Sequence, residues 1–540
     1  MILFSAMKRL QFLQMPRLDP DVSTPGENAM LAAACLSEAL ARAPEAAHWE
    51  ILAVLETQDS GSDRVIVEEL VARAPDVLAA TCYLWNIERT LTLIQRVRAR
   101  LPTLNVALGG PEIVEEHPLL QDFDGILSVG EGEPRIAPIL RAFRLGEPLQ
   151  VDHVEPVTPA FALYRSGTHA AMETSRGCPM KCAFCCYNIR RTTLSCLPVA
   201  EVALRIRQLR EAGVTEIRMI DPTFNAHPRF HDLLHVMQAE NPQQSIAFFV
   251  EIRADTLTDE EAAALAKAGV TEAEVGVQST DPAVLKIIHR PLDEAKVWRG
   301  VAALLRHGIK PTIDFMYGLP AQDESDMQRS LDALARFGDA VHPQFLPTLL
   351  LPGTELRVRA KELGLVAQSL PPYRVLATDR LTAVQLAAIE DEAVERLGAF
   401  DTPTRRFIGV RIPDLFQRRG KTRSDVSGCD SINCRSTCYI DLEACGLRAS
   451  IRVIEAAVAA EPHILWQFVL RIREEMPLDL FERIIEAMQR LPGHWLDRLV
   501  SPPGESQLAA RRLFVQLPAR HGMSPDWVAA VDDLFARAFH

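Results

Sequence analysis

The sequence predicts an α/β protein with a Rossmann-like N-terminal domain, a partial (β/α)6 barrel of the TIM type and a mostly helical C-terminal domain. Two stretches of the chain alternate short apolar runs with amphipathic segments, which is typical of parallel sheets covered by helices. A proline-bearing segment separates these stretches, and 540 residues exceed the size of one hydrophobic core. We therefore expect three domains, over residues 1–150, 165–368 and 380–540.

In the first domain, four strands are expected in the runs EILAVLE, DVLAATC, NVALGG and DGILSV, with helices near 63–73, 86–100 and 131–144. Ligands of such sheets bind at the carboxyl ends of the strands. The turns there are TQDSGSD (57–63), GGPE (109–112) and VGEGE (129–133), and their glycines let the backbone approach a ligand closely. Tight turns without a ligand explain each of them equally well.

Six strand–helix units follow in the second domain. The strand-like runs are AAMETS, EIRMID, IAFFVE, EAEVGVQ, KPTIDFMYG and HPQFLPTLL, and the helices lie near 198–212, 228–240, 259–268, 293–307, 323–337 and 354–363. A barrel of this kind carries its chemistry at the carboxyl ends of its strands. In the third domain, HILWQFVLRIREEM and LDLFERIIEAMQRL repeat apolar residues every three to four positions, which predicts helices.

Composition narrows the classes of function. The net charge of −13 argues against a nucleic-acid partner, because phosphate contacts need clustered Lys and Arg. No run of about 18 apolar residues predicts a membrane span, and no signal peptide is apparent, so we expect a cytoplasmic protein. Eleven cysteines, eight of them in two clusters, indicate metal or redox chemistry in a reducing compartment.

The first cluster lies in RGCPMKCAFCCYN (176–188), directly after the first barrel strand. Cys178, Cys182 and Cys185 have the spacing CxxxCxxC, and cysteine thiolates are the usual ligands of iron-sulfur clusters. Three ligands leave one iron of a 4Fe-4S cluster open to a small molecule. Zinc is the competing metal, but structural zinc prefers four ligands in paired spacings. We leave Cys186 out of the ligand set.

This motif, with Phe184 before its last cysteine, resembles the radical S-adenosylmethionine (radical SAM) enzymes over about residues 165–365. The resemblance implies that S-adenosylmethionine chelates the fourth iron. An electron from a reductant such as flavodoxin or ferredoxin then cleaves it to methionine and a 5'-deoxyadenosyl radical. The resemblance also implies that residues at the ends of the following strands contact S-adenosylmethionine, namely Asp221, Asn225, Glu251, Arg253, Gln278 and Ser279. The family's usual Gly-Gly-Glu form is absent. For Glu251 and Arg253, an ordinary rim salt bridge is the alternative.

The α/β domain before the barrel is similar to the cobalamin-binding domain of the cobalamin-dependent (class B) subfamily. The similarity implies a cobalamin site at the glycine-bearing turns, formed by Asp59, Gly61, Gly109, Gly110, Gly130, Glu131 and Gly132. The stretch QDSGSDR offers no axial histidine, as is common in this subfamily. A cobalamin that is absent or merely structural is the alternative.

The second cluster comprises Cys429, Cys434, Cys438 and Cys445 and predicts a second metal site. An auxiliary iron-sulfur cluster, structural zinc, a thiol site for a soft substrate and buried thiols all remain open.

Three functions are compatible with these features. The first is methylation of an unactivated carbon in a small-molecule or peptide substrate, such as a natural-product or cofactor precursor. The second is a radical rearrangement, ring contraction or cyclisation with the same cofactors. The third is a cobalamin- or metal-sensing module. Catalytic residues and the substrate cannot be assigned from the sequence.

Overall fold

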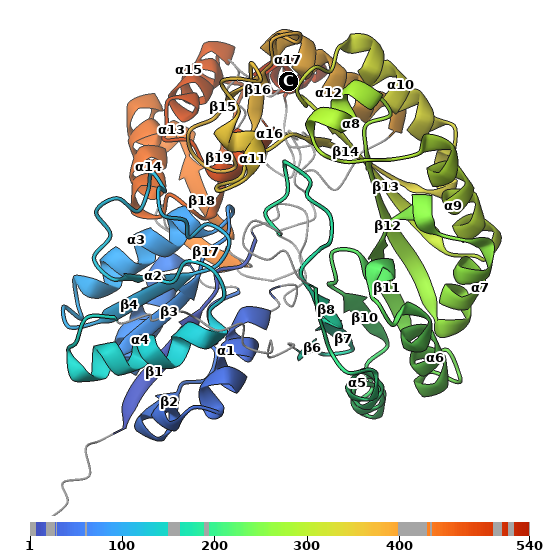
Figure 1. The fold of residues 1–540 in the computed structure, drawn as a ribbon. Helices are drawn as coiled ribbons and strands as arrows, with labels where there is room; N and C mark the ends of the chain where they lie inside the picture. Colours follow the sequence, from blue (N-terminus) through green and yellow to red (C-terminus); the bar gives the residue numbers. More distant parts are fainter. Residues whose placement is uncertain are drawn as a thin grey trace, which may run out of the picture.

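The computed structural model describes residues 7–17, 28, 30–59, 62–149, 163–187, 194–397, 429–432, 435–500, 510–516 and 523–538. Three larger sheets divide these residues into three units (Figure 1). Within the described ranges, no helix combines the length and the apolar character that a bilayer span requires.

The first unit is a five-stranded parallel sheet with strand order β2-β1-β3-β4-β5. Its strands are β1 (Lys8–Leu13), β2 (Trp49–Ile51), β3 (Val77–Thr81), β4 (Asn105–Gly109) and β5 (Ile126–Leu127). Its helices are α1 (Leu31–Ala41), α2 (Asp63–Arg73), α3 (Ile87–Arg98) and α4 (Glu133–Leu145). The predicted Rossmann-like architecture is confirmed, but β1 and α1 were not among the predicted elements.

Helices cover both faces of this sheet because alternate residues of its inner strands are buried on opposite sides. Leu10 and Phe12 of β1 belong to the core that α1 and α4 close. Leu13 belongs to the other core, together with residues of α2 and α3. The carboxyl ends of the strands therefore form the open edge of the unit.

The second unit is a seven-stranded sheet with the order β14-β13-β12-β11-β10-β7-β6, parallel except for the β6/β7 pair. The strands are β6 (Leu163–Ser166), β7 (His169–Met172), β10 (Glu216–Met219), β11 (Ala247–Ile252), β12 (Val270–Gln278), β13 (Lys310–Tyr317) and β14 (His342–Pro347). The helices are α5 (Val199–Glu211), α6 (Phe230–Glu240), α7 (Asp259–Ala268), α8 (Pro282–Ile287), α9 (Glu294–Arg306), α10 (Glu324–Ala335) and α11 (Glu355–Val358). Each of the six predicted runs contains a strand. β6 and β14 are the two edges, so the barrel is partial, as expected.

Burial alternates along the barrel strands. In β11, Phe248, Val250 and Ile252 are buried in the core beneath the helices, whereas Phe249 and Glu251 face the concave side. Figure 1 shows the helices on the outer side of this curved sheet. The concave face is consequently open for side chains that bind a ligand.

The helix α12 (Ala383–Leu397) corrects the predicted start of the third domain at residue 380. Leu386, Ile389 and Ala393 of α12 lie in the core of the barrel. The helix packs beside α10 and so belongs to the second unit.

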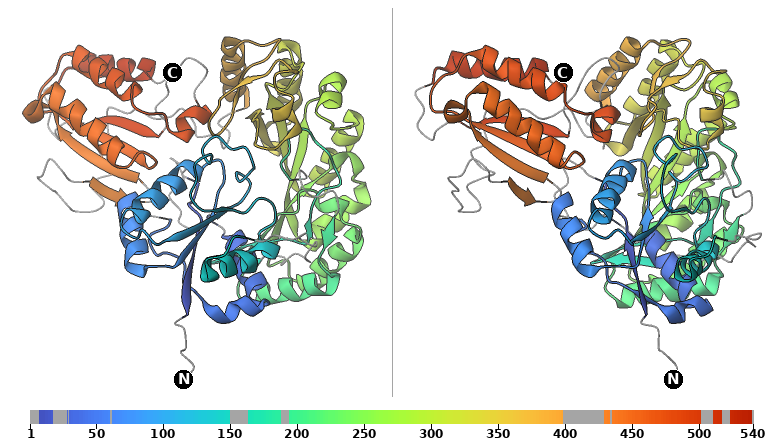
Figure 2. Two further views of the ribbon diagram at one scale, coloured as in Figure 1. Left: turned by 60° about the vertical axis from the view of Figure 1, so that its left-hand side comes forward. Right: turned by 90° about the vertical axis from the view of Figure 1, so that its left-hand side faces the viewer.

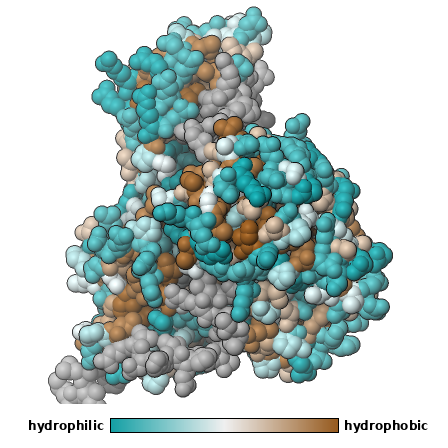
Figure 3. Space-filling view, turned by 45° about the horizontal axis from the view of Figure 1, so that its top comes forward, coloured by the Kyte–Doolittle hydropathy of each residue, from teal (hydrophilic) through white to brown (hydrophobic). Residues whose placement is uncertain are grey.

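The third unit is not built from helices alone. It contains the four-stranded sheet β17-β18-β19-β20, in which only the β17/β18 pair is antiparallel. The strands are β17 (Cys429–Ile432), β18 (Arg435–Asp441), β19 (Leu465–Arg471) and β20 (Arg511–Gln516). The helices are α13 (Leu442–Cys445), α14 (Leu447–Ala460), α15 (Leu478–Gln489), α16 (Trp495–Val500) and α17 (Pro525–Ala538). This unit forms a separate lobe (Figures 2 and 3).

The helix expected over HILWQFVLRIREEM is wrong, because β19 occupies half of that segment, from Leu465 to Arg471. β19 lies between two parallel neighbours and is nearly continuously buried. A short apolar run of this kind cannot be distinguished from a helix by periodicity alone. The helix expected over LDLFERIIEAMQRL is confirmed as α15.

The segment 368–374, which follows the barrel, joins the three units. Nη1 of Arg374 donates to the carbonyl of Leu499 in the third unit over 2.7 Å, and Nη2 lies 3.3 Å from the Tyr317 hydroxyl of β13. Tyr373 contacts the first unit through its hydroxyl group. These contacts fix the arrangement of the three sheets around a common centre.

Candidate functional site

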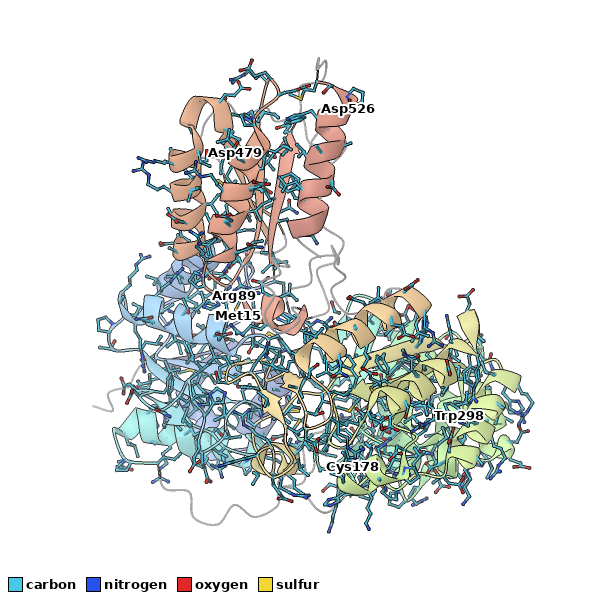
Figure 4. The ribbon with its side chains drawn as sticks, turned by 90° about the horizontal axis from the view of Figure 1, so that it is seen from above. Met15, Arg89, Cys178, Trp298, Asp479 and Asp526 are labelled. Atoms are coloured by element: carbon cyan, nitrogen blue, oxygen red, sulfur yellow. The ribbon has the colours of Figure 1, made fainter. Side chains whose placement is uncertain are left out.

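The cysteine loop follows β7 at the carboxyl end of the barrel. Its start, β8 (Ser175–Arg176), pairs with β9 (Ser195–Cys196), which holds the loop against the barrel. Figure 4 shows Cys178 on the margin of the barrel next to the N-terminal unit. The predicted ligands therefore lie where the first two units meet.

Each predicted ligand sulfur has a polar contact, and those of Cys182 and Cys185 accept from an N–H donor. Sγ of Cys178 lies 3.5 Å from the Thr223 hydroxyl, and Sγ of Cys182 accepts from Nη1 of Arg290 at the same distance. Sγ of Cys185 accepts from the backbone N–H of Tyr187 over 3.4 Å. Hydrogen bonds of this kind stabilise anionic sulfur and tune iron-sulfur clusters. The three side chains thus fit the ligand set of a 4Fe-4S cluster.

Burial makes the thiolate form of Cys185 dependent on a positive partner. Burial, together with the neighbouring cysteines, raises the pKa of Cys185 to about 12. A buried thiol in this environment keeps its proton unless a metal replaces it.

A cavity of about 630 Å³ adjoins the cysteine loop. Met180, which lies between the first two cysteines of the motif, forms one wall, and Thr223 contributes both to the cavity and to the contact with Cys178. Arg253 and Asp255 at the end of β11 form another wall, and Pro291 and its neighbours before α9 close it. The cavity therefore combines the cysteine loop with the ends of two barrel strands.

Two of the six predicted S-adenosylmethionine contacts line this cavity, namely Asn225 and Arg253. The Asn225 amide bonds the backbone N–H and C=O of Arg253, each over 2.9 Å, and so joins the ends of β10 and β11. The Arg253 guanidinium binds Asp255, the Pro291 carbonyl and Sδ of Met180. It pairs with Asp255 and not with Glu251, so the alternative of a Glu251–Arg253 salt bridge is not formed.

Asp221 does not reach the cavity. It is 0% exposed, and its carboxylate accepts hydrogen bonds from the Thr174 N–H over 3.0 Å, from the Thr174 hydroxyl over 2.7 Å and from the Ser175 hydroxyl. These bonds tie the end of β10 to the start of the cysteine loop. In this structure Asp221 positions the loop.

The remaining predicted contacts lie elsewhere. Ser279 is buried, and its hydroxyl accepts from the Asp281 N–H over 3.1 Å in the turn before α8. Gln278 is buried at an irregularity of β12 with a φ of 71°. Glu251 lies on the concave face beside Glu274, and burial together with that carboxylate raises its pKa to about 7. None of the three is among the residues that line the cavity.

The predicted cobalamin turns gather at the open edge of the N-terminal sheet. Gly110 has a φ of 103°, and a Cβ there would lie 2.6 Å from the Cys82 carbonyl oxygen, so this turn requires glycine. Around Gly109, in contrast, a Cβ would meet nothing closer than 4.0 Å. Next to it, the buried Ser128 hydroxyl has no hydrogen-bond partner among the described residues. The orphaned hydroxyl at this edge fits a bound ligand.

The other turn residues have more local contacts. Asp59 accepts from the Asn28 amide over 2.8 Å, and Gly61 lies outside the described residues. Gly130 has a φ of 94° beside Glu131, in the turn between β5 and α4. A Cβ at Gly132 would lie 2.8 Å from the Leu36 side chain, so this glycine allows α1 to pack against the start of α4.

Sequence reasoning missed a buried network that reaches this edge. Glu112 of the GGPE turn accepts from the Tyr373 hydroxyl over 2.6 Å and lies 3.0 Å from Nε2 of His117. His117 also lies 2.7 Å from the Tyr373 hydroxyl. Glu112 is part of the GGPE turn that the sequence singled out, but no local pattern connects it to a tyrosine 261 positions away.

Arg176, the first residue of the quoted motif, was also missed. Its guanidinium binds Glu133 at the start of α4 and Glu173 after β7, and all three side chains are largely buried. It also lies 3.5 Å from Sγ of Cys35 in α1. Arg176 therefore ties the cysteine loop to the N-terminal unit.

A stacked aromatic pair follows β3 at the same edge. Tyr83 and Trp85 have ring centroids 4.4 Å apart, and Trp85 also packs against the third unit. Burial, first of all, and then the neighbouring Cys35 and Glu173 raise the pKa of Tyr83.

The second cysteine cluster gains no support from the described residues. The Cys438 side chain is buried in the hydrophobic core of the third unit, whereas Cys445 ends α13. Cys434 and the side chain of Cys429 lie outside the described residues. Among described residues, no group of three or more His, Cys, Asp or Glu is arranged to hold a single metal ion.

Comparisons with known proteins agree with this geometry. The profile of the Radical SAM superfamily matches residues 172–334, which span the cysteine loop and most of the barrel. The cobalamin-dependent radical SAM methyltransferase TokK of Streptomyces tokunonensis is 24% identical over 344 residues, covering 53% of this chain and 49% of TokK. The 2-(S-pantetheinyl)-carbapenam-3-carboxylate methyltransferase of Streptantibioticus cattleyicolor is 21% identical over 358 residues, covering 56% and 52%.

The chain thus spans about half the length of these curated relatives. Among solved structures, the radical S-adenosylmethionine methyltransferase TsrM of Kitasatospora setae, with cobalamin and a [4Fe-4S] cluster bound, has a TM-score of 0.55 at 18% identity. The alignment covers 68% of this chain and 82% of TsrM, which extends the shared fold beyond the barrel. The three-cysteine loop and most of the six-stranded parallel barrel therefore lie within the residues that the Radical SAM superfamily profile matches.

Proposed function

We propose that this protein is a cobalamin-dependent radical SAM enzyme that methylates an unactivated carbon of a small natural-product or cofactor precursor. The single observation that carries the proposal is the position of the three cysteine sulfurs, each with a polar contact, beside a cavity and next to the open edge of the N-terminal sheet. The names of TokK, of the carbapenam relative and of TsrM, all methyltransferases, support the choice of reaction.

When bound, the cluster and S-adenosylmethionine supply a 5'-deoxyadenosyl radical, and cobalamin supplies the methyl group. Cys178, Cys182 and Cys185 would hold the cluster. Asn225 and Arg253 would line the S-adenosylmethionine site, where the guanidinium can meet a carboxylate.

The N-terminal unit would hold cobalamin at its carboxyl edge. Gly109 leaves room for a close approach, and the Ser128 hydroxyl offers an unused hydrogen bond. Through Arg176 and the Glu112–Tyr373 bond, this edge is attached to the cysteine loop and to the segment after the barrel. The substrate would then lie between the two units.

Anaerobic reconstitution tests the proposal. Wild-type protein should bind iron and cobalamin and should form 5'-deoxyadenosine, S-adenosylhomocysteine and a product heavier by one methyl group. Cys182→Ala should lose iron and S-adenosylmethionine cleavage, whereas Cys186→Ala, a change four residues away, should retain iron.

Other outcomes separate the alternatives. Formation of 5'-deoxyadenosine without S-adenosylhomocysteine would contradict methylation and favour a radical rearrangement or cyclisation. Iron binding without any cleavage of S-adenosylmethionine would contradict the enzyme proposal and favour a sensing module.

A further inference from the structure

Three carboxylates lie on neighbouring strands of the concave barrel face. Glu251 of β11 is the register partner of Glu274 of β12, and Asp314 of β13 is the partner of Gly276, two positions further along β12. Residues two apart in a strand point to the same face, so the three side chains converge. The intervening Val275 and the flanking Ile313 are instead buried under the helices.

The positive charges nearby only partly balance this group. Arg218 of β10 lies 3.5 Å from Glu274, but its side chain is 54% exposed and rests on the Phe249 ring, 3.8 Å from its centroid. Arg290 binds the Gly276 carbonyl and Sγ of Cys182. Three buried or half-buried carboxyl groups therefore face two guanidinium groups, the loosely held one of Arg218 and that of Arg290, whose buried Nε has no hydrogen-bond partner among the described residues.

Asp314 shows that the group is incomplete. Its side chain is 7% exposed, and Oδ1 has no hydrogen-bond partner among the described residues. A buried carboxylate oxygen without a donor costs free energy and calls for a partner that the chain itself does not supply. Burial and the neighbouring carboxyl groups raise the pKa of Asp314 and Glu251, and Arg290 and Arg218 offset these shifts only in part.

The carboxylates also lie close to the predicted reaction centre. Arg290 contacts Sγ of Cys182 and also donates to the Gly276 carbonyl. Gly276 of β12 is the register partner of Asp314 in β13. A Cβ at Gly276 would lie 3.0 Å from the Arg290 guanidinium, so glycine lets the arginine reach this position. A molecule held by the carboxylates is consequently next to the cysteine loop.

We propose that Glu251, Glu274 and Asp314 bind a cationic group of the substrate, an ammonium or a guanidinium. The proposal rests on the proposed function, because it names the substrate class of the same enzyme. An N–H donor of the cation would satisfy Oδ1 of Asp314, and its charge would offset the carboxylates. This anchoring would hold the rest of the substrate towards the cysteine loop.

Ligand-observed saturation-transfer NMR on the reconstituted holoenzyme tests the proposal. The probes are the cation n-butylammonium, its neutral isostere n-butanol, and the anion butyrate. Wild-type protein should bind n-butylammonium in preference to both other probes. Asp314→Asn and Glu274→Gln should each weaken that binding at least about tenfold, since each removes a charged partner from a buried site. Glu260→Gln on the exposed surface of α7 is the matched control and should bind as wild type does.

Equal binding of n-butylammonium and n-butanol by the wild type would overturn the proposal, and this comparison does not depend on whether a variant folds. Unchanged n-butylammonium binding in both variants, at wild-type iron content, would also overturn it. S-adenosylmethionine cleavage is measured on the same wild-type sample. Its absence would contradict the proposed function, whereas cleavage without a preference for the cation would contradict only the present inference.

Discussion

The Tyr373 hydroxyl donates a 2.6 Å hydrogen bond to Oε2 of Glu112 and thereby ties the segment after the barrel to the turn that follows β4. His117 shares both partners, and all three side chains are buried. The bond crosses from the second unit to the first, at the edge where the cobalamin site is proposed. Contacts of this kind determine how the cysteine loop faces the N-terminal sheet.

Tyr373→Phe should destabilise the protein by about 1–3 kcal/mol, because it removes one of the two groups that hydrogen-bond to buried Glu112. Urea unfolding of the wild type, of this variant, of Glu112→Gln and of the double variant measures the coupling. The two single effects should not add, since the residues share one bond. Strict additivity would contradict a direct interaction.

Arg176→Gln should destabilise the attachment of the N-terminal unit by about 3–5 kcal/mol, because Glu133 and Glu173 would remain buried without their partner. Hydrogen exchange along α4 should become faster. The control is Arg42→Gln, which breaks an exposed pair with Glu38 and should cost only about 0–1 kcal/mol. Equal effects of the two variants would contradict a bridging role for Arg176.

Arg290→Met should lower the reduction potential of the cluster, because it removes a hydrogen bond and a positive charge from Sγ of Cys182. A redox titration followed by electron paramagnetic resonance measures the midpoint. Lys286→Met, at an exposed position of α8, is the control and should leave the midpoint potential unchanged. A midpoint that stays the same or rises in Arg290→Met would count against the contact.

Because of Glu251, the free energy of unfolding should decrease as the pH rises. Its pKa is raised from 4.5 to about 7, first by burial and then by Glu274, while Arg218 opposes the shift and Asp221 adds to it. Between these values the folded state holds a proton that the unfolded state releases. The favourable contribution is therefore complete below about pH 4.5 and is lost as the pH rises to about 7, with a total of roughly 3 kcal/mol.

Glu251→Gln should remove this dependence. Unfolding midpoints at several pH values between about 5 and 8 should converge for wild type and variant at the acid end and should favour the variant at the alkaline end. Glu260→Gln should follow the wild type throughout. Parallel curves for wild type and Glu251→Gln would contradict the raised pKa.

The barrel strands were predictable because each is a compact apolar run that ends in polar residues, as in VEIRAD and MIDPTFN. The inner strand β1 was missed because KRLQFL interrupts its apolar residues with polar ones. Gln11 is completely buried there, and its amide binds the carbonyls of Phe12 and Ala53. A buried polar residue whose hydrogen bonds go to backbone carbonyl groups does not fit the apolar pattern by which a buried strand is predicted.

For the site residues too, local sequence patterns were predictable and contacts between distant parts of the chain were not. The spacing of Cys178, Cys182 and Cys185 is local and could be read directly, whereas Asp221 was expected at the cavity and is instead enclosed by Thr174 and Ser175. The direction in which a side chain points beyond a strand end depends on the neighbouring turn, which the sequence alone does not specify. The Arg176 and Tyr373 contacts join distant parts of the chain and had no sequence signal.

The central claim is that three cysteines hold a 4Fe-4S cluster whose open iron binds S-adenosylmethionine. Electron paramagnetic resonance of the reduced, reconstituted protein, with and without S-adenosylmethionine, tests it most directly. We expect about four iron atoms per chain and a cluster signal that changes when S-adenosylmethionine is added, with both lost in Cys182→Ala. Tightly bound zinc in place of iron, or a cluster signal that S-adenosylmethionine leaves unchanged, would contradict the account.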